Sequence, residues 1–440
     1  MAIIPQKALF GWEEIENLGD LDRLGLVLRH LPDEALMRHL EQDRGQGRDD
    51  YPIRAVWNSV LAGIVYQHPS MESLRRELKR NGQLRNLCGF DPAKGQSAVP
   101  AACVYSRFLD VLFAHAEWIE AMFEGLVEAL RGPLADFGRH LTLDSKALAS
   151  AGRPRKEGSP TAADGRRDLD ADVGVKTYRG RRADGTTWEK IVKWFGYKVH
   201  LIVEAQYELP VAYEVTKASA ADVVEGRDLV DQLAQRHPDL VEGSQALMAD
   251  KAYDDTTFLK NLWDDEGIKP IIDIRNMWKD GETTRRVEGQ TNVVYDYQGT
   301  VSCCCLKTGE LRPLAFGGFE QDRNTLKYRC PARHYGIACA SRKTCPVGQA
   351  VRIPLSEDRR IFTPVARSSY QWKRLYKERT AVERVNSRLD VSFGFERHFI
   401  RGQTKMKTRM GLALIVMLAM ALGRIKEKQA EHLRSLVRAA

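Results

Sequence analysis

The N-terminal part of the chain is dominated by apolar residues that recur every three or four positions. IRAVWNSVLAGIVY, residues 53–66, and VYSRFLDVLF, residues 104–113, both have this spacing, which is typical of amphipathic helices. The pattern predicts an all-helical N-terminal domain over residues 1–135. Inside it, Ser70 is a candidate helix N-cap, and Asn81 followed by glycine indicates a helix stop.

Strand-like alternation begins near residue 140, where HLTLDS predicts a strand that ends at Asp144. The polar stretch 150–187 predicts a loop. Four further strands are predicted after it, and the third of these is short, buried and ends at Asp250. Their sequences are EKIVKWFGYKVHLIVE, LPVAYEVT, QALMAD and KPIIDI, with helical patterns separating the last three. This order predicts a mixed sheet flanked by helices over residues 136–274.

The remainder of the chain divides into an irregular part and a helical part. Residues 275–366 lose both periodicities and contain six of the eight cysteines, so we interpret them as an insertion. Residues 367–440 then complete the domain. Within them, the uncharged run 410–422 is shorter than the roughly 20 residues of a membrane-spanning helix, so it predicts a buried helix and no membrane association. The predicted fold class is therefore α/β.

The net charge of the chain indicates an acidic partner. The chain carries a net charge of +8, and residues 367–409 alone hold twelve Lys and Arg against four Asp and Glu. A surplus of this kind favours nucleic acid as a partner. The helical pattern at 71–80 is also basic, which fits either a DNA-binding unit or a helical bundle with a solvated basic face.

A helix in the basic segment presents an unusual set of side chains. In YKERTAVERVNSRLD, residues 376–390, the side chains of Tyr376, Arg379 and Glu383 fall on one helical face. A surface ion pair of about 0.2–0.5 kcal/mol between the last two would explain the spacing. The alternative is that the helix delivers a carboxylate to Asp144 and Asp250. Three such carboxylates can hold two divalent cations about 3.5–4 Å apart for phosphoryl transfer.

Several motifs, taken in order, resemble those of the DDE transposases of bacterial insertion sequences. The branch concerned is marked by a Tyr-x2-Arg-x3-Glu-x6-Lys signature. The matching stretches are YPIRAVWNSVLAG, SMESLRREL, LTLDSK, FGYKVH, LMADKAYD, YKERTAVERVNSRL and HFIRG. They extend over nearly the whole chain. At the lysine position of the signature this chain has Asp390, which replaces a positive phosphate contact by a negative charge.

The resemblance implies a ribonuclease-H-like catalytic domain in which Asp144, Asp250 and Glu383 are the catalytic metal ligands. They would bind two Mg²⁺ ions, for which Mn²⁺ can substitute. The DNA-binding residues that we expect are Tyr376, Arg379, Lys198, Arg397 and Arg401. The implied partners are double-stranded DNA, as terminal inverted repeats and target, and a second copy in a synaptic homodimer. The implied location is cytoplasmic and nucleoid-associated, since the N-terminal residues lack the pattern of a secretory signal.

Two alternatives to strand cleavage and transfer stay open at this point. A domesticated DNA-binding protein would have an idle centre, and a metal-dependent nuclease would cut without joining. The cysteines raise a separate question. Cys330, Cys339 and Cys345 lack the C-x2-C spacing of common zinc sites, so we expect them to be structural. Cys303 to Cys305 and His334 are available as a fourth ligand if zinc binds.

Overall fold

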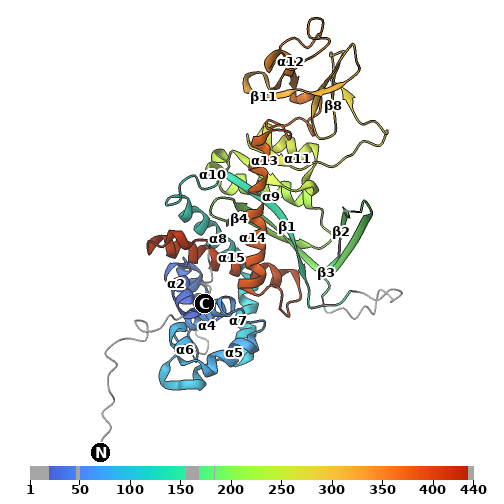
Figure 1. Ribbon diagram of the computed structural model, residues 1–440. Coiled ribbons are helices and arrows are strands. Elements are labelled where there is room, and N and C mark those ends of the chain that lie inside the picture. Colours follow the sequence, from blue (N-terminus) through green and yellow to red (C-terminus); the bar gives the residue numbers. More distant parts are fainter. Residues whose placement is uncertain (1–18, 46–49, 155–167, 183, 435–440) are drawn as a thin grey trace, which may run out of the picture. The chain divides into compact units, whose positions relative to one another are not determined.

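The computed structural model describes residues 19–45, 50–154, 168–182 and 184–434 (Figure 1). The chain forms two compact units, each assembled from separate segments. The first unit comprises Met1–Leu134, Ala147–Tyr197 and Asn386–Ala440, and the second comprises Ala135–Lys146 and Lys198–Val385. These units cut across the four segments predicted from the sequence, so the predicted domain boundaries stay predictions.

The first unit is mainly helical, as the apolar periodicity predicted. Its helices before the sheet are α2 (Asp20–His30), α3 (Glu34–Arg44), α4 (Ile53–Val65), α5 (Met71–Arg80), α6 (Gly82–Cys88), η1 (Pro92–Ala98), α7 (Ala102–Ala114) and α8 (Ala116–Arg131). Ser70 caps α5 by accepting a hydrogen bond from the Ser73 amide at 3.2 Å. Asn81 ends α5, and its side chain caps α6 through the Leu84 amide at 2.9 Å. Both predicted helix boundaries are therefore confirmed.

The core of this helical part is α15 (Gln403–Lys426), which packs against α8, α2 and α4. Its length and composition would also suit a membrane span, but 89% of its most apolar window is buried inside the protein. Gly423 permits the close approach of α2, because a Cβ there would lie 2.7 Å from Leu26 Cγ. The buried helix predicted for 410–422 is thus confirmed as part of α15.

The central sheet is mixed, as predicted, and has six strands among the described residues. Its strands are β1 (His140–Ala149), β2 (Asp172–Arg181), β3 (Thr187–Glu204), β4 (Leu209–Lys217), β5 (Ala246–Ala249) and β6 (Lys269–Ile272). The order is β2-β3-β1-β5-β6, with β4 also paired to β3. The β1–β5 and β5–β6 pairs are parallel, whereas β2 and β3 are antiparallel.

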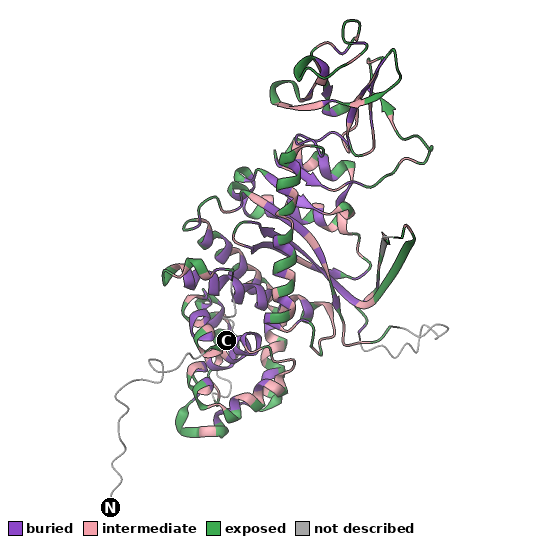
Figure 2. Cartoon of the chain, viewed as in Figure 1, coloured by how far each residue is buried: buried purple, intermediate pink, exposed green. Residues whose placement is uncertain are grey.

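Two details of the sheet correct the sequence prediction. β1 does not end at Asp144 but continues to Ala149. The predicted loop 150–187 contains β2, while residues 155–167 of that loop lie outside the described residues. β2 escaped detection because main-chain pairing with β3, and not burial, holds it. Val175 of β2 and Ile191 of β3 are both exposed. Figure 2 shows the same contrast along β3, whose residues 187–193 are exposed and 196–204 buried.

Helices of the second unit cover its strands. They are α9 (Asp222–Arg236), α10 (Pro238–Gly243), η3 (Lys251–Tyr253), α11 (Thr256–Lys260), η4 (Asn261–Asp265) and α13 (Tyr370–Lys377), followed by α14 (Thr380–Phe393), which runs on into the first unit. α13 packs on β5 and β6, where Trp372 and Leu375 share a core cluster with Met248 and Ile271. The helix that carries Tyr376 is therefore anchored to the strand that precedes Asp250.

The insertion is more regular than its sequence predicted. It contains two small antiparallel sheets with the orders β10-β9-β8-β7 and β11-β12-β13. The strands are β7 (Arg285–Arg286), β8 (Val293–Tyr295), β9 (Val301–Cys304), β10 (Leu311–Pro313), β11 (Ala315–Glu320), β12 (Thr325–Arg329) and β13 (Ala350–Pro354), with the short helices η5 (Gln321–Arg323), α12 (Pro331–His334) and η6 (Leu355–Glu357). Strands this short show little periodicity. They share one buried cluster that includes Val293, Leu326 and Ile353.

Close packing beneath the sheet gives a first prediction. Gly226 of α9 lies against Tyr253 and Leu143, because a Cβ there would be 2.7 Å from Tyr253 Cε1 and 3.0 Å from Leu143 Cδ2. Gly226→Ala should lower the free energy of unfolding by about 1–3 kcal/mol, because a packed core resists added volume. Urea denaturation measures this, with Gly243→Ala as the control, since a Cβ at Gly243 meets nothing within 4 Å. Equal stability of the two variants would contradict this account of the packing.

Candidate active site

The register of β1 and β5 brings two predicted carboxylates together. The pairs run in parallel from His140 opposite Ala246 to Leu143 opposite Ala249. Asp144 and Asp250 each follow the last pair, so they stand at the same level of neighbouring strands. Paired strands lie about 4.8 Å apart. The predicted short, buried strand before Asp250 is present as β5, and it ends at Ala249, one residue earlier than predicted.

Main-chain amides orient both aspartates. The Ser145 amide donates to Asp144 Oδ1 at 2.8 Å. The Ala252 amide donates to Asp250 Oδ1, also at 2.8 Å, so that Asp250 caps η3. Both aspartates are half-buried. Because the amides fix one oxygen of each carboxylate, the rotation of each side chain is restricted.

Tyr253 reveals a third carboxylate that the sequence analysis missed. The phenol is 1% exposed, and burial is the largest cause that raises the pKa of Tyr253 well above its usual value. Negative charge from Asp144, Asp222 and Asp250 raises it further. Asp222 therefore belongs to the same neighbourhood. It is the first residue of α9, where an acidic residue looks like ordinary helix stabilisation, so its sequence context gave no signal.

Lys198 is placed to hold Asp222. Its side chain is nearly buried, and its ammonium donates to Asp222 Oδ1 at 2.9 Å and to the Ala220 carbonyl at 2.8 Å. The ammonium is thus directed into the protein beside the carboxylates. The DNA contact expected of Lys198 stays a prediction, and the observed geometry gives this lysine a positioning role.

Tyr376 is held by a stacked ring. Trp372 lies one helical turn before it, with the ring centroids 4.6 Å apart and the planes 13° from parallel. Burial is the main cause that raises the pKa of Tyr376, and the charges of Asp273 and Asp250 add to it. The phenol is therefore in the electrostatic range of Asp250. Trp372 is buried and supports this ring from below.

Arg379 interacts electrostatically with both Glu383 and Asp144. Its guanidinium donates to Glu383 Oε1 at 2.7 Å and lies 5.7 Å from the centroid of the Tyr376 ring. Burial lowers the pKa of Arg379, but Glu383, Tyr376 and Asp144 together outweigh burial and raise it. Arg379 and Glu383 therefore form the expected i,i+4 ion pair. The negative charge of Asp144 also acts on the Arg379 guanidinium. Glu383 itself is half-exposed.

Glu378, the nearest other acid on this segment, is engaged elsewhere. Its Oε2 lies 2.7 Å from Nδ1 of His140 at the start of β1. Asp144 lies four positions after His140, a distance of about 13 Å along the strand. The geometry therefore favours Glu383 over Glu378 as the acid that accompanies Asp144.

The carboxylates are neighbours but do not form a closed ligand set. Among the residues that the structure describes, His, Cys, Asp and Glu form no group of three or more that could hold a metal ion as the side chains stand. Asp144 and Asp250 are brought together by the strand register, whereas the Glu383 carboxylate lies on Arg379. Their oxygens are nevertheless the donors that Mg²⁺ prefers. The assignment of these three residues as metal ligands stays a prediction.

The remaining candidates belong to the first unit. Arg397 is exposed beyond the end of α14, and Arg401 donates from Nε to the Ala151 carbonyl at 3.3 Å. Asp390 is a half-buried residue of α14. The roles of Arg397 and Arg401 as DNA contacts stay predictions.

Comparison with known proteins identifies the class of this chain. The family model described as "Transposase DDE domain" matches residues 167–419, which is 253 of the 440 residues. The chain therefore belongs to the DDE transposase family, and this domain implies polynucleotidyl transferase activity. The match includes Asp250 and Glu383 and begins after Asp144.

Other comparisons add little. No curated protein matches the chain. Among solved structures, the cryo-EM structure of a piggyBac transposase synaptic complex with hairpin DNA is similar at 13% identity and a TM-score of 0.38. That alignment covers 96% of this chain and 80% of the other. A TM-score of this size is too low to establish a shared fold.

The Lys198–Asp222 pair gives a second prediction. Asp222→Asn should lower the free energy of unfolding by about 3 kcal/mol, because it leaves a nearly buried ammonium without its anion. Chemical denaturation measures the change. Asp228→Asn on the same helix is the matched control, since its side chain is 53% exposed and surface changes usually stay within about 0.5 kcal/mol. If both variants lose the same small amount, the pair does not stabilise this part of the site.

Proposed function

We propose that this DDE transposase cleaves and joins DNA strands at the terminal inverted repeats of a bacterial insertion sequence. The observation that carries the proposal is the placement of Asp144 beside Asp250 on adjacent parallel strands. The Tyr-x2-Arg-x3-Glu spacing supports the insertion-sequence branch that is marked by this signature. In this spacing Arg379 binds Glu383 and also interacts electrostatically with Asp144. We further propose that the catalytic domain is ribonuclease-H-like, since a mixed sheet with these acids at neighbouring strands suits that fold.

The cofactor that suits this site is a pair of Mg²⁺ ions, for which Mn²⁺ can substitute. DDE transposases generally use divalent metals. Here Asp144, Asp250 and Glu383 offer hard oxygen donors, which magnesium requires. When bound, such ions make water or a 3′-hydroxyl nucleophilic and stabilise the leaving oxygen of an in-line displacement.

The residues of the chain would prepare the site for that displacement. The Ser145 and Ala252 amides donate to one oxygen of Asp144 and one oxygen of Asp250, and so orient both carboxylates before DNA binds. Tyr253 fills the space beneath the acids and excludes water from it, since it is 1% exposed. A site that is fixed in advance needs little rearrangement during the reaction.

Arg379 and Tyr376 would position the DNA backbone. A guanidinium has five N–H donors and can bind a phosphate with two parallel hydrogen bonds. Release of Glu383 by Arg379 would free the carboxylate for its cation at the moment when the arginine takes a phosphate. The Tyr376 ring, stacked on Trp372, is held in place to donate its hydroxyl to a neighbouring phosphate.

Double-stranded DNA is the partner that the charge favours. α13 exposes Lys373, Arg374 and Lys377 next to the site, and residues 367–409 carry a net charge of +8. Basic residues on one segment attract the phosphate backbone independently of sequence. Because transposition brings two element ends together, we propose that a homodimer supplies one active site to each end.

A third prediction tests the role of Glu383. Glu383→Gln keeps the shape of the side chain but removes the charge that a divalent cation needs. Magnesium-dependent cleavage of a labelled element end should fall by several orders of magnitude, while end binding in a mobility-shift assay persists. Asp144→Asn and Asp250→Asn should behave in the same way. Glu378→Gln is the matched control and should keep its cleavage activity, because Glu378 binds His140.

The outcomes separate the competing functions. Normal cleavage by Glu383→Gln, with both Asp variants inactive, would show that Glu383 serves only as a surface partner of Arg379, worth about 0.2–0.5 kcal/mol. Cleavage by the wild type without strand-transfer products would indicate a nuclease. End binding without cleavage in Mg²⁺ or Mn²⁺ would indicate a DNA-binding protein.

A further inference from the structure

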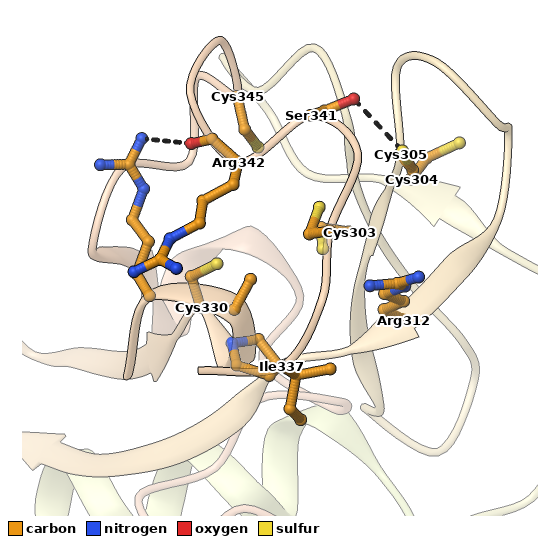
Figure 3. Close-up of a pocket in the computed structure, with 13 residues that line it drawn as sticks. Cys303, Cys304, Cys305, Arg312, Cys330, Ile337, Ser341, Arg342 and Cys345 are labelled. Atoms are coloured by element: carbon orange, nitrogen blue, oxygen red, sulfur yellow. Dashed lines mark hydrogen bonds between the residues drawn. The ribbon is translucent and has the colours of Figure 1, made fainter. Parts of the chain in front are cut away.

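Cysteines of the insertion gather around one pocket in the second unit (Figure 3). They are Cys303, Cys304, Cys305, Cys330, Cys339 and Cys345. All eight cysteines of the chain are free thiols. Neither the proposed active site nor the proposed binding of DNA accounts for these thiols.

The thiols come from both small sheets of the insertion. Cys303 points inward from β9, where burial alternates along Val301–Cys304. Cys330 follows β12 of the other sheet directly and precedes α12, while Cys339 and Cys345 lie in the connection between α12 and β13. A group bound among them would therefore tie the two sheets together.

Two of the six pocket-lining thiols have oxygen atoms outside the cysteine group as hydrogen-bond partners, which leaves four candidates for a shared ligand. Cys304 alternates with Cys303 along β9, and its Sγ donates to the Gly309 carbonyl at 3.5 Å. Cys305 has its Sγ 3.2 Å from Ser341 Oγ, a contact visible in Figure 3. The other thiols interact with one another: burial raises the pKa of Cys303 to about 11, and Cys330, Cys345 and Cys339 add to this effect.

The pocket has the size and charge for one small cation bound by thiolates. Its volume is ≈ 20 Å³, which accommodates about one water-sized particle. Arg312, Arg333 and Arg342 line it, and four thiolates around a divalent cation leave two negative charges for these guanidiniums to offset. Arg333 is itself fixed by donating to the Arg342 carbonyl at 2.9 Å.

We propose that Cys303, Cys330, Cys339 and Cys345 bind one zinc ion in a structural, tetrahedral site that joins the two sheets of the insertion. Zinc is the metal for which a set of four thiolates with tetrahedral geometry is typical. The thiols described here are open and not yet at coordinating positions, in keeping with the absence of a preformed ligand group among the described residues.

Zinc replaces a proton on each thiol. Four thiols lose four protons and form four Zn–S bonds, so the bound site carries two negative charges and no electrons are exchanged. Protons compete with the metal for each of the four sulfur atoms. Zinc affinity should therefore rise with pH and fall as the solution is acidified.

The fourth prediction is the zinc content of full-length protein purified under reducing conditions. Elemental analysis should find about one zinc per chain, and the ion should be lost in Cys303→Ser and in Cys330→Ser. Cys304→Ser and Cys103→Ser are the matched controls and should retain it, because Cys304 faces the Gly309 carbonyl and Cys103 is an exposed residue of α7. A chelator should lower the unfolding temperature of the wild type but not of Cys330→Ser.

Cobalt substitution tests the site in the wild-type protein, so the result does not depend on whether the cysteine variants fold. Co²⁺ added to the metal-free wild type should give the sulfur-to-metal charge-transfer absorption of a tetrahedral thiolate site. The proposal is overturned if the wild type binds neither zinc nor cobalt with this signature. It is also overturned if Cys304→Ser loses as much zinc as Cys330→Ser, or if the four thiols are found paired as disulfides in the reduced preparation.

Discussion

The parallel pairing of β1 with β5 is the interaction on which the site depends. Main-chain hydrogen bonds set the register that ends with Leu143 opposite Ala249, and that register alone brings Asp144 level with Asp250. A slip of one residue would turn one aspartate to the opposite face of the sheet. The buried residues that pack against this strand pair would therefore serve the proposed chemistry as well as stability, because they keep the register from changing.

Several carboxylates lie near this strand pair, and basic side chains compensate their negative charge. Asp222 adds a third carboxylate near Tyr253, and Lys198 compensates it from a nearly buried position. Arg379 likewise compensates the charge of Glu383 through a hydrogen-bonded ion pair, and it also interacts electrostatically with Asp144. The surface ion pair and the functional carboxylate are thus compatible explanations of one spacing. An arginine that neutralises the acid in one state can release it when phosphate and cations arrive.

Much of this arrangement follows from the sequence, and the exceptions have physical causes. Long amphipathic helices, the caps at Ser70 and Asn81 and the strand before Asp250 are local features, so their patterns predicted them. β2 was missed because pairing with β3 stabilises it without burial. Asp222 was missed because tertiary structure brings it to Tyr253, and its position at a helix start gave no signal. The cysteines were noticed in the sequence, but their spacing does not show that they line one pocket.

The most direct measurement of the central claim is electron paramagnetic resonance of Mn²⁺ bound to the full-length protein with an element end. Two ions held by the strand-borne aspartates and Glu383 would lie about 3.5–4 Å apart, close enough for their spins to couple. The account predicts two coupled ions per chain, with the coupling lost in Asp144→Asn and in Asp250→Asn. Isolated Mn²⁺ signals, or coupling that survives either substitution, would contradict the claim that the β1–β5 register builds the catalytic site.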